Sequence, residues 1–194
     1  MKKIVYLPLD ERPCNYDFCG FMVQNNNEIN FVRPEKSDLG LKKTPAEYLS
    51  VKNFLSRECA DADYLILAVD MLLYGGIVPS RLHYLSQEEI FSRVDFIGTL
   101  KKSNPKLKVF AFSLVMRCPT YSCGDEEPDY YETYGEKIFL YGVNEHKFID
   151  KLITKEQYET EKAHLDVPQE YLRDYVSRRK INLAALLRTL KLVG

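Results

Sequence analysis

The chain alternates short apolar runs with longer stretches in which apolar residues recur at helical spacing. An alternation of this kind is typical of βα units built around a parallel sheet. The apolar runs predict strands at 3–9, 28–33, 63–69 and 106–115. The predicted fold class is therefore α/β, with a mainly parallel sheet that resembles the first part of a barrel-like or doubly wound fold.

Signals for helix starts lie between these strands. Thr44-Pro-Ala-Glu47 has the form of a capping box with proline at the first helical position, and it predicts a helix that runs to about residue 60. Ser86-Gln-Glu-Glu89 is a second capping box, and its helix should end at Asn104-Pro105. Each of these helices would connect two parallel strands.

Beyond Arg117 the pattern changes from strands to helices. A stretch rich in turn formers predicts a loop at 118–128, and helical stretches, the last of them C-terminal, are predicted at 129–151, 154–165 and 166–192. We predict one domain over 1–194, with a βα core at 1–117 and a loop with helices at 118–194. Gly194 has the form of a helix stop where another strand should begin. We therefore expect the front part of a larger βα fold, either as a natural short form or as a fragment.

Composition and charge narrow the classes of function. Hydrophobic residues make up 45% of the 194 positions, enough to bury a core. The 27 basic residues are balanced by 28 acidic ones, so there is no basic surplus to neutralise phosphates, and we expect no nucleic-acid partner. No apolar run is long enough to cross a membrane. The five cysteines form an odd set that favours reduced thiols, and we expect a cytoplasmic protein.

Polar and charged side chains follow the predicted strands at their carboxyl ends, in the segments 10–15 and 70–81. In α/β sheets, ligands bind beyond the carboxyl ends of the strands. The predicted catalytic residues are Asp10 and Asp70, and the predicted substrate-binding residues are Glu11, Arg12, Asn15, Tyr74, Ser80, Arg81 and Arg117. The arginines favour a small anionic or polyhydroxylated ligand.

A structural interpretation of the same residues stays open. Asp10 can cap the turn that follows the first strand while Arg12 forms an ion pair with it, and Asp70 can pair with Arg81. No metal site is predicted, because Cys118 and Cys123 lack a second pair of cysteines or histidines at zinc-site spacing. No cofactor is predicted, because the sequence contains neither a P-loop nor a dinucleotide-binding fingerprint.

Two segments resemble a known family. Tyr6-Leu-Pro-Leu-Asp-Glu-Arg-Pro-Cys-Asn-Tyr16 and Asp70-Met-Leu-Leu-Tyr-Gly-Gly-Ile-Val-Pro-Ser-Arg81 resemble the uncharacterised bacterial family known as domain of unknown function 4127. The resemblance implies a helix-wrapped βα sheet or barrel, with strand-end acids similar to those of barrel glycoside hydrolases. Members of that family are usually much longer and contain a later block of adjacent aspartates that has no counterpart in this sequence.

Three hypotheses about function follow. The first is a carbohydrate-active hydrolase, or the N-terminal part of one, with Asp10 and Asp70 as its polar anchors. The second is a non-catalytic binding module for a small anionic metabolite, and the third is an inactive truncated remnant. Under each of these hypotheses we expect the chain to self-associate through an uncovered edge of the incomplete sheet.

Overall fold

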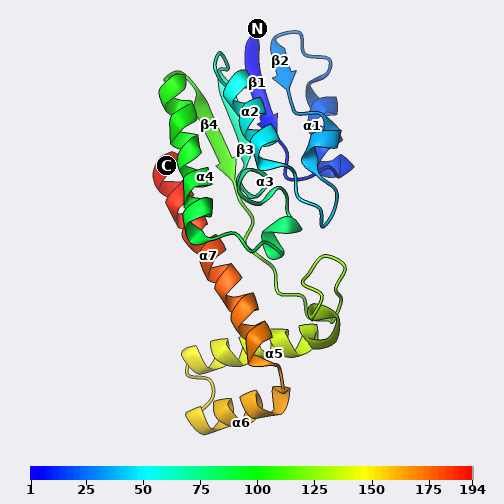
Figure 1. Ribbon diagram of the computed structural model, residues 1–194, viewed down its shortest axis with the longest axis vertical. Coiled ribbons are helices and arrows are strands. Elements are labelled where there is room, and N and C mark those ends of the chain that lie inside the picture. The colour runs from blue at the N-terminus through cyan, green and yellow to red at the C-terminus, as the bar shows by residue number, and fades with distance from the viewer. Residues whose placement is uncertain (194) are drawn as a thin grey trace. The chain divides into compact units, whose positions relative to one another are not determined.

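A computed structural model describes residues 1–193, so the helix stop predicted at Gly194 lies outside the described residues. Four strands form one sheet in the order β2-β1-β3-β4, and every neighbouring pair is parallel. The strands are β1 (Lys2–Leu7), β2 (Ile29–Val32), β3 (Tyr64–Ala68) and β4 (Lys108–Phe112) (Figure 1). The predicted α/β class is confirmed, and the sheet is open rather than closed into a barrel.

The strand order fixes where the polar loops meet. Leu7 at the end of β1 pairs with Leu67 of β3, and Leu67 pairs with Ala111 of β4. The carboxyl ends of these three strands therefore lie at one edge, which confirms the predicted parallel arrangement. From β1 the chain moves outward to β2 and then crosses back to β3, so the strand order reverses between β1 and β3, as in doubly wound folds.

The chain forms seven helices within residues 1–193. They are α1 (Pro13–Val23), α2 (Tyr48–Glu58), α3 (Val69–Tyr74), α4 (Gln87–Ser103), α5 (Tyr131–Ile149), α6 (Lys155–Leu165) and α7 (Gln169–Val193), with short 3-10 turns η1 (Lys36–Leu39) and η2 (Pro79–Arg81). The capping box predicted at Ser86 is confirmed, and Thr154 forms another. Each of these side chains accepts a hydrogen bond from the third helical amide, and the backbone amide of the same residue donates to the side chain of Glu89 or Gln157. None of these helices is long and apolar enough to span a membrane.

Several predicted boundaries are wrong. The capping box at Thr44 does not form: α2 begins at Tyr48, and the Glu47 side chain caps it by accepting from the Ser50 amide at 2.8 Å. The strand predicted at 106–115 ends at Phe112, and α3 begins where the third strand was expected to continue. Asp166 ends α6 in a left-handed conformation instead of opening the next helix.

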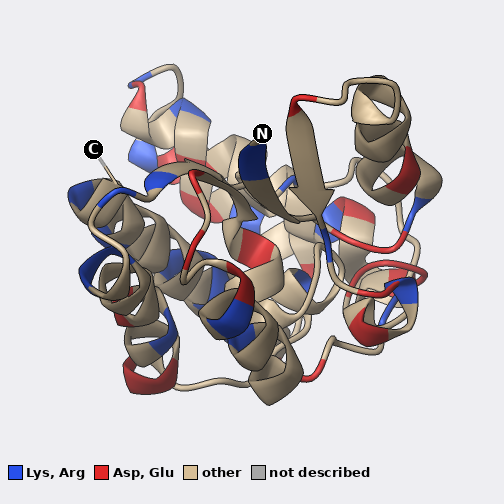
Figure 2. Cartoon of the chain, turned by 90° about the horizontal axis from the view of Figure 1, so that it is seen from above, with Lys and Arg blue, Asp and Glu red and all other residues tan. Residues whose placement is uncertain are grey.

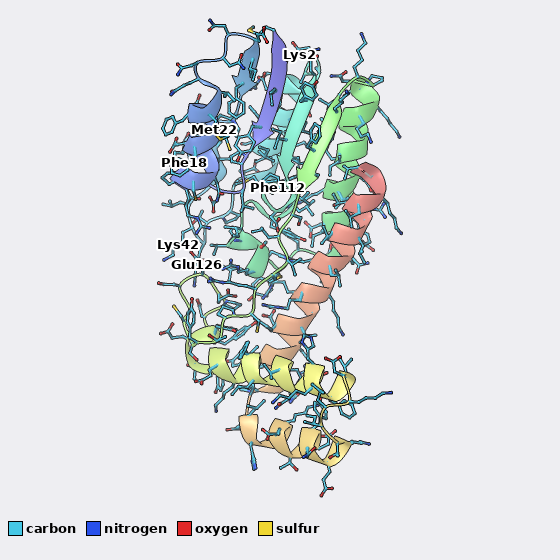
Figure 3. The ribbon with its side chains drawn as sticks, turned by 180° about the vertical axis from the view of Figure 1, so that it is seen from behind. Lys2, Phe18, Met22, Lys42, Phe112 and Glu126 are labelled. Carbon is cyan, nitrogen blue, oxygen red and sulfur yellow. The ribbon has the colours of Figure 1, made fainter. Side chains whose placement is uncertain are left out.

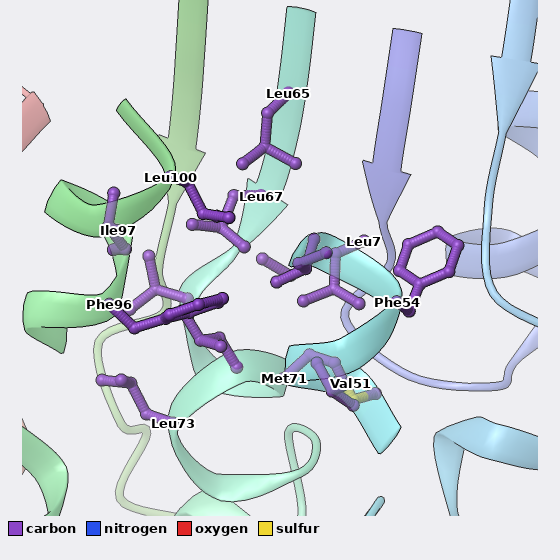
Figure 4. Close-up of a cluster of buried hydrophobic side chains, with 14 of the residues drawn as sticks. Leu7, Val51, Phe54, Leu65, Leu67, Met71, Leu73, Phe96, Ile97 and Leu100 are labelled. Carbon is purple, nitrogen blue, oxygen red and sulfur yellow. The ribbon is translucent and has the colours of Figure 1, made fainter. Parts of the chain in front are cut away.

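One face of the sheet holds the main core. Leu7, Leu65 and Leu67 are completely buried beneath α2 and α4 (Figure 4). Leu55 of α2 and Ile97 of α4 are also completely buried there. Each such side chain contributes about 1.5–3 kcal/mol when it is removed from water. This packing fixes β1 and β3 side by side, and with them the loops that follow.

The opposite face of the sheet is only partly covered. Successive strand residues point to opposite faces, so Tyr6 lies on the face away from the core, where its hydroxyl donates to the Asn15 carbonyl of α1 at 2.6 Å. On β4 the same face carries Phe110 and Phe112, which are 59% and 38% exposed. Figure 3, a view from behind, shows Phe112 at the end of β4 and α1 beside β1 and β2.

The chain divides into two compact units. The first contains residues up to Val115 together with the last part of α7 from Ile181 on, and the second spans Met116–Lys180. Arg188 of α7 pairs with Asp95 of α4 at 2.7 Å, which holds that helix end on the first unit. The second unit has its own small core, formed by Tyr131, Ile138, Val167, Leu172 and Tyr175. The helices carry both acidic and basic residues (Figure 2).

Candidate functional site

The segments that follow β1 and β3 define the candidate site. Leu7 and Leu67 are partners in the sheet. Asp10 comes three residues after Leu7, and Asp70 comes three residues after Leu67. Both carboxyl groups therefore belong to the carboxyl edge, at the point where the strand order reverses. In open parallel sheets this point is where ligands bind.

Asp10 organises the loop that contains it. Its side chain is almost fully buried, and Arg12 contacts one carboxylate oxygen through Nε and Nη2, both at 2.6 Å. The other oxygen accepts from Asn15 Nδ2 at 2.6 Å and from the Arg12 amide at 3.1 Å. Three predicted site residues thus form one hydrogen-bonded turn directly before and within α1. These contacts are explained equally well by a structural role, in which Asp10 caps the turn after β1, and by a role in binding a ligand.

Asp70 lies in the first turn of α3 and is only 3% exposed. Its Oδ2 accepts hydrogen bonds from the Leu114 amide at 3.0 Å and from Ser113 Oγ at 3.1 Å. Burial raises the pKa of Asp70 above its ordinary value, while these hydrogen bonds and the charge of Arg81 act in the opposite direction. A carboxyl group in this environment holds its proton to a higher pH than a surface aspartate, which suits a proton donor.

The segment after Asp70 is rigid for identifiable reasons. Gly75 ends α3 in a left-handed conformation with φ of 82°, and its carbonyl accepts from the Ala46 amide at 3.0 Å. A Cβ at Gly75 would lie 2.7 Å from the Ala46 nitrogen, so only glycine fits this close approach. Tyr74, one helical turn after Asp70, stacks on His83 with 4.6 Å between ring centroids. The Asp70 charge adds to burial in raising the pKa of the Tyr74 phenol.

Ser80 and Arg81 lie in η2 and are both buried. The Ser80 hydroxyl donates to the Ile77 carbonyl at 2.7 Å. The backbone carbonyl of Ser80 accepts from Asn182 Nδ2 at 2.9 Å. Asn182 Oδ1 in turn lies 2.8 Å from His83 Nε2. These contacts give Ser80 a structural role, because its hydroxyl is already engaged with the backbone of its own turn.

Two other predicted residues have polar partners other than Asp10 and Asp70. Glu11 accepts from the Lys42 amide at 3.2 Å, which connects the β1 loop to the loop before α2. The strand predicted at 106–115 would place Arg117 just beyond its end, but β4 ends at Phe112. Arg117 belongs to the second unit, where it lies 3.5 Å from Glu126 and 3.6 Å from Glu127. The prediction that Arg117 follows directly on the strand is therefore wrong.

Sequence reasoning missed the partners of Asp70. Ser113 and Leu114 lie just beyond the end of β4, within the stretch predicted as strand, and both donate hydrogen bonds to Asp70. Polar Ser113 within an otherwise apolar run was the one available signal. The predicted site residues Asp10, Arg12 and Asn15 were found together because they are close in sequence.

No group of three or more potential metal ligands occurs among residues 1–193. The five cysteines are free, and Cys118 accepts a hydrogen bond from the Tyr175 hydroxyl at 3.2 Å in the core of the second unit. That contact gives the thiol a packing role.

Comparison with known proteins bears on the whole chain. No curated protein and no solved structure matches it. The family model described as "Protein of unknown function (DUF4127)" matches residues 4–194, which include both segments that carried the resemblance. The chain therefore belongs to the DUF4127 family.

Proposed function

We propose that the segments following β1 and β3 form the site of a carbohydrate hydrolase, with Asp70 as the general acid. The observation that carries this proposal is the buried Asp70 carboxyl at the point of strand reversal, with its pKa raised by burial. Glycoside hydrolysis uses one carboxyl that holds its proton and a second that is ionised. Asp10 supports the second role, since Arg12 forms an ion pair with it.

The proposed reaction transfers one proton at each carboxyl. Asp70 donates its proton to the glycosidic oxygen as the bond from that oxygen to the anomeric carbon breaks. A water molecule forms the new bond to this carbon and loses its proton to Asp10. Arg12 and Arg81 orient the sugar through its hydroxyl or acid groups, consistent with arginine as a donor to oxygen ligands.

Hydrolysis of a panel of 4-nitrophenyl glycosides and glycuronides tests this proposal. We expect release of 4-nitrophenol by the wild-type chain, with kcat lowered about 100-fold or more in Asp70→Asn, because proton transfer contributes at least that factor. Asp38→Asn, an exposed acid of η1, is the matched control and should keep wild-type kcat. Turnover that is equal in Asp70→Asn and the wild type would reject the assignment of Asp70.

A second candidate is a non-catalytic binding module for a small anionic metabolite. It is favoured by the contacts of Asp10, since both of its carboxylate oxygens are engaged by Arg12 and Asn15. Thermal denaturation with sugar acids, amino sugars and phosphates separates the two functions. A ligand present at a concentration 100 times its Kd stabilises the folded state by about 2.7 kcal/mol. Stabilisation without turnover of the matching glycoside would favour the binding module.

A further inference from the structure

A cavity that the proposed reaction does not use lies in the first unit. It has a volume of about 630 Å³ and is bordered by the segment before α2, by η2 and by α4. Asp10 and Asp70 are not among its lining residues. A volume of this size is within the range of small-molecule sites, which are mostly apolar with a few placed polar groups.

Aromatic rings form much of the wall of this cavity. The rings of Tyr74 and His83 are stacked with an interplanar angle of 16°. The guanidinium carbon of Arg93 lies over the Tyr48 ring, 4.3 Å from the centroid of that ring. Tyr84 also lines the cavity, although its side chain is 88% exposed. The wall thus combines ring faces held by packing with one ring that is accessible from solvent. Flat rings stack on such surfaces.

The charged residues of the wall favour an anion. Arg93 is fixed in place because its Nη1 donates to the Leu73 carbonyl at 2.5 Å while its guanidinium stacks on Tyr48. Lys43 is a second basic residue of the lining. Glu47 is the one acidic residue of the lining, and its carboxylate is used to cap α2. The cations therefore outnumber the acid around the cavity.

The remaining lining distinguishes a flat ring from a sugar. It consists of proline, alanine and leucine side chains, among them Pro45, Pro79 and Leu85. Apolar groups offer no partners to the several hydroxyls of a carbohydrate, and a polar group buried without a partner costs free energy. A flat apolar ring with a single anionic group matches both the walls and the charge.

We propose that this cavity is a second ligand site, which binds an aromatic carboxylate. The ring lies among Tyr48, Tyr74 and Tyr84, and the carboxylate pairs with Arg93 or Lys43 at the wall. This site is separate from the carboxyl pair of Asp10 and Asp70, so it stands whether or not the chain hydrolyses glycosides.

Titration calorimetry with 2-naphthoate tests the site, with 2-naphthalenemethanol as a neutral analogue of similar shape. We expect naphthoate to bind the wild type at least tenfold more tightly than the neutral analogue. Arg93→Met should weaken naphthoate binding at least tenfold, and the control Arg57→Met, an exposed arginine of α2, should not change it. Equal binding of the two compounds, or an equal effect of both variants, would overturn the proposal.

Two further measurements keep the test independent of the folding of Arg93→Met. Tyr84→Ala alters an exposed ring and should fold normally, and we expect it to weaken naphthoate binding several-fold. Amide chemical-shift mapping of the wild type should move the signals of Ala46, Leu82 and Tyr84. Shifts confined to Phe110 and Phe112 on the sheet would reject this site. Asp70→Asn should bind naphthoate as the wild type does, so a failure of the hydrolase proposal is recognised separately.

Discussion

At the scale of single residues, burial of Asp70 raises the pKa of its carboxyl group, and the hydrogen bonds to that group only partly offset this rise. Its raised pKa means that the folded chain holds the proton over a pH range in which the unfolded chain has lost it. The contribution of this carboxyl to stability is therefore complete below the unfolded pKa of about 3.9, and it is lost as the pH rises through the folded pKa. Asparagine has nearly the same shape and does not titrate.

We expect the free energy of unfolding of Asp70→Asn to increase relative to that of the wild type as the pH rises from about 4 to neutrality. Urea unfolding at several pH values measures this difference. The control Asp38→Asn should show no such trend, because its side chain is exposed. A difference that shrinks with rising pH would mean that the ionised carboxylate is stabilised in the fold.

Asn104 is a second buried polar residue with a clear structural role. Its Nδ2 donates to the carbonyls of Cys59 and Ala62 at 2.9 and 2.8 Å, and its Oδ1 accepts from the Lys106 amide at 3.2 Å. These bonds join the loop before β3 to the loop before β4. They explain why an asparagine, 8% exposed, ends α4 at this position.

Asn104→Ala should lower the free energy of unfolding by about 2–3 kcal/mol, because it removes the side-chain hydrogen bonds to two buried carbonyls. Urea denaturation measures the loss. Asn53→Ala, at an exposed position of α2, serves as the control and should stay within about 0.5 kcal/mol of the wild type. Similar losses for the two variants would show that the Asn104 bonds contribute little.

At the scale of the elements, the success of each prediction depends on how local its cause is. The capping boxes at Ser86 and Thr154 formed because both partners lie within one turn. The box at Thr44 failed because the Ala46 amide bonds to the Gly75 carbonyl, a partner distant in sequence. Helix α1 was missed because it turns few side chains inward; Phe18 and Met22 are exposed, so its apolar residues do not mark a buried stripe.

The same distinction holds for the candidate site. The turn of Asp10, Arg12 and Asn15 was predictable from neighbouring positions, whereas the bonds from Ser113 and Leu114 to Asp70 depend on the pairing of β3 with β4. Sequence spacing does not report such contacts. The strand-end placement of both aspartates was predictable because it follows from the parallel sheet alone.

Gly75→Ala should destabilise the chain by at least about 2 kcal/mol, because a side chain in the left-handed region is strained and the new Cβ would overlap the Ala46 backbone. Gly142→Ala is the matched control, since a Cβ at that position of α5 meets nothing within 4 Å. It should raise stability by up to about 1 kcal/mol through helix propensity. Thermal and urea unfolding of both variants measure the contrast, which would be absent if the α3 end could relax.

At the scale of the whole molecule, the sheet keeps apolar surface accessible. Within the described residues β4 is a terminal strand of the sheet, and its Phe110 and Phe112 are exposed on the face away from the core. Parallel sheets normally have both faces covered, and edge strands with apolar side chains recruit further chains. These features support the proposal that copies of the chain associate.

We expect the sedimentation coefficient of the wild type to increase with protein concentration. Phe110→Lys should shift this association to higher concentration, because it places a charge on the exposed face. Leu49→Lys changes an equally exposed apolar residue of α2 and should have no effect. A monomer at all concentrations, or an equal effect of both variants, would contradict association through β4.

The strand order also has a consequence for the time course of folding. Lys2 pairs with Ile29, but Ile4 of the same strand pairs with Tyr64, so the central pairing requires a much longer loop to close. Longer loops cost more entropy, and such pairings form slowly. As the chain leaves the ribosome, β1 and β2 can meet well before β3 is complete. During that interval the inner edge of β1 has no partner strand, and it is then that the growing chain most needs protection from its neighbours.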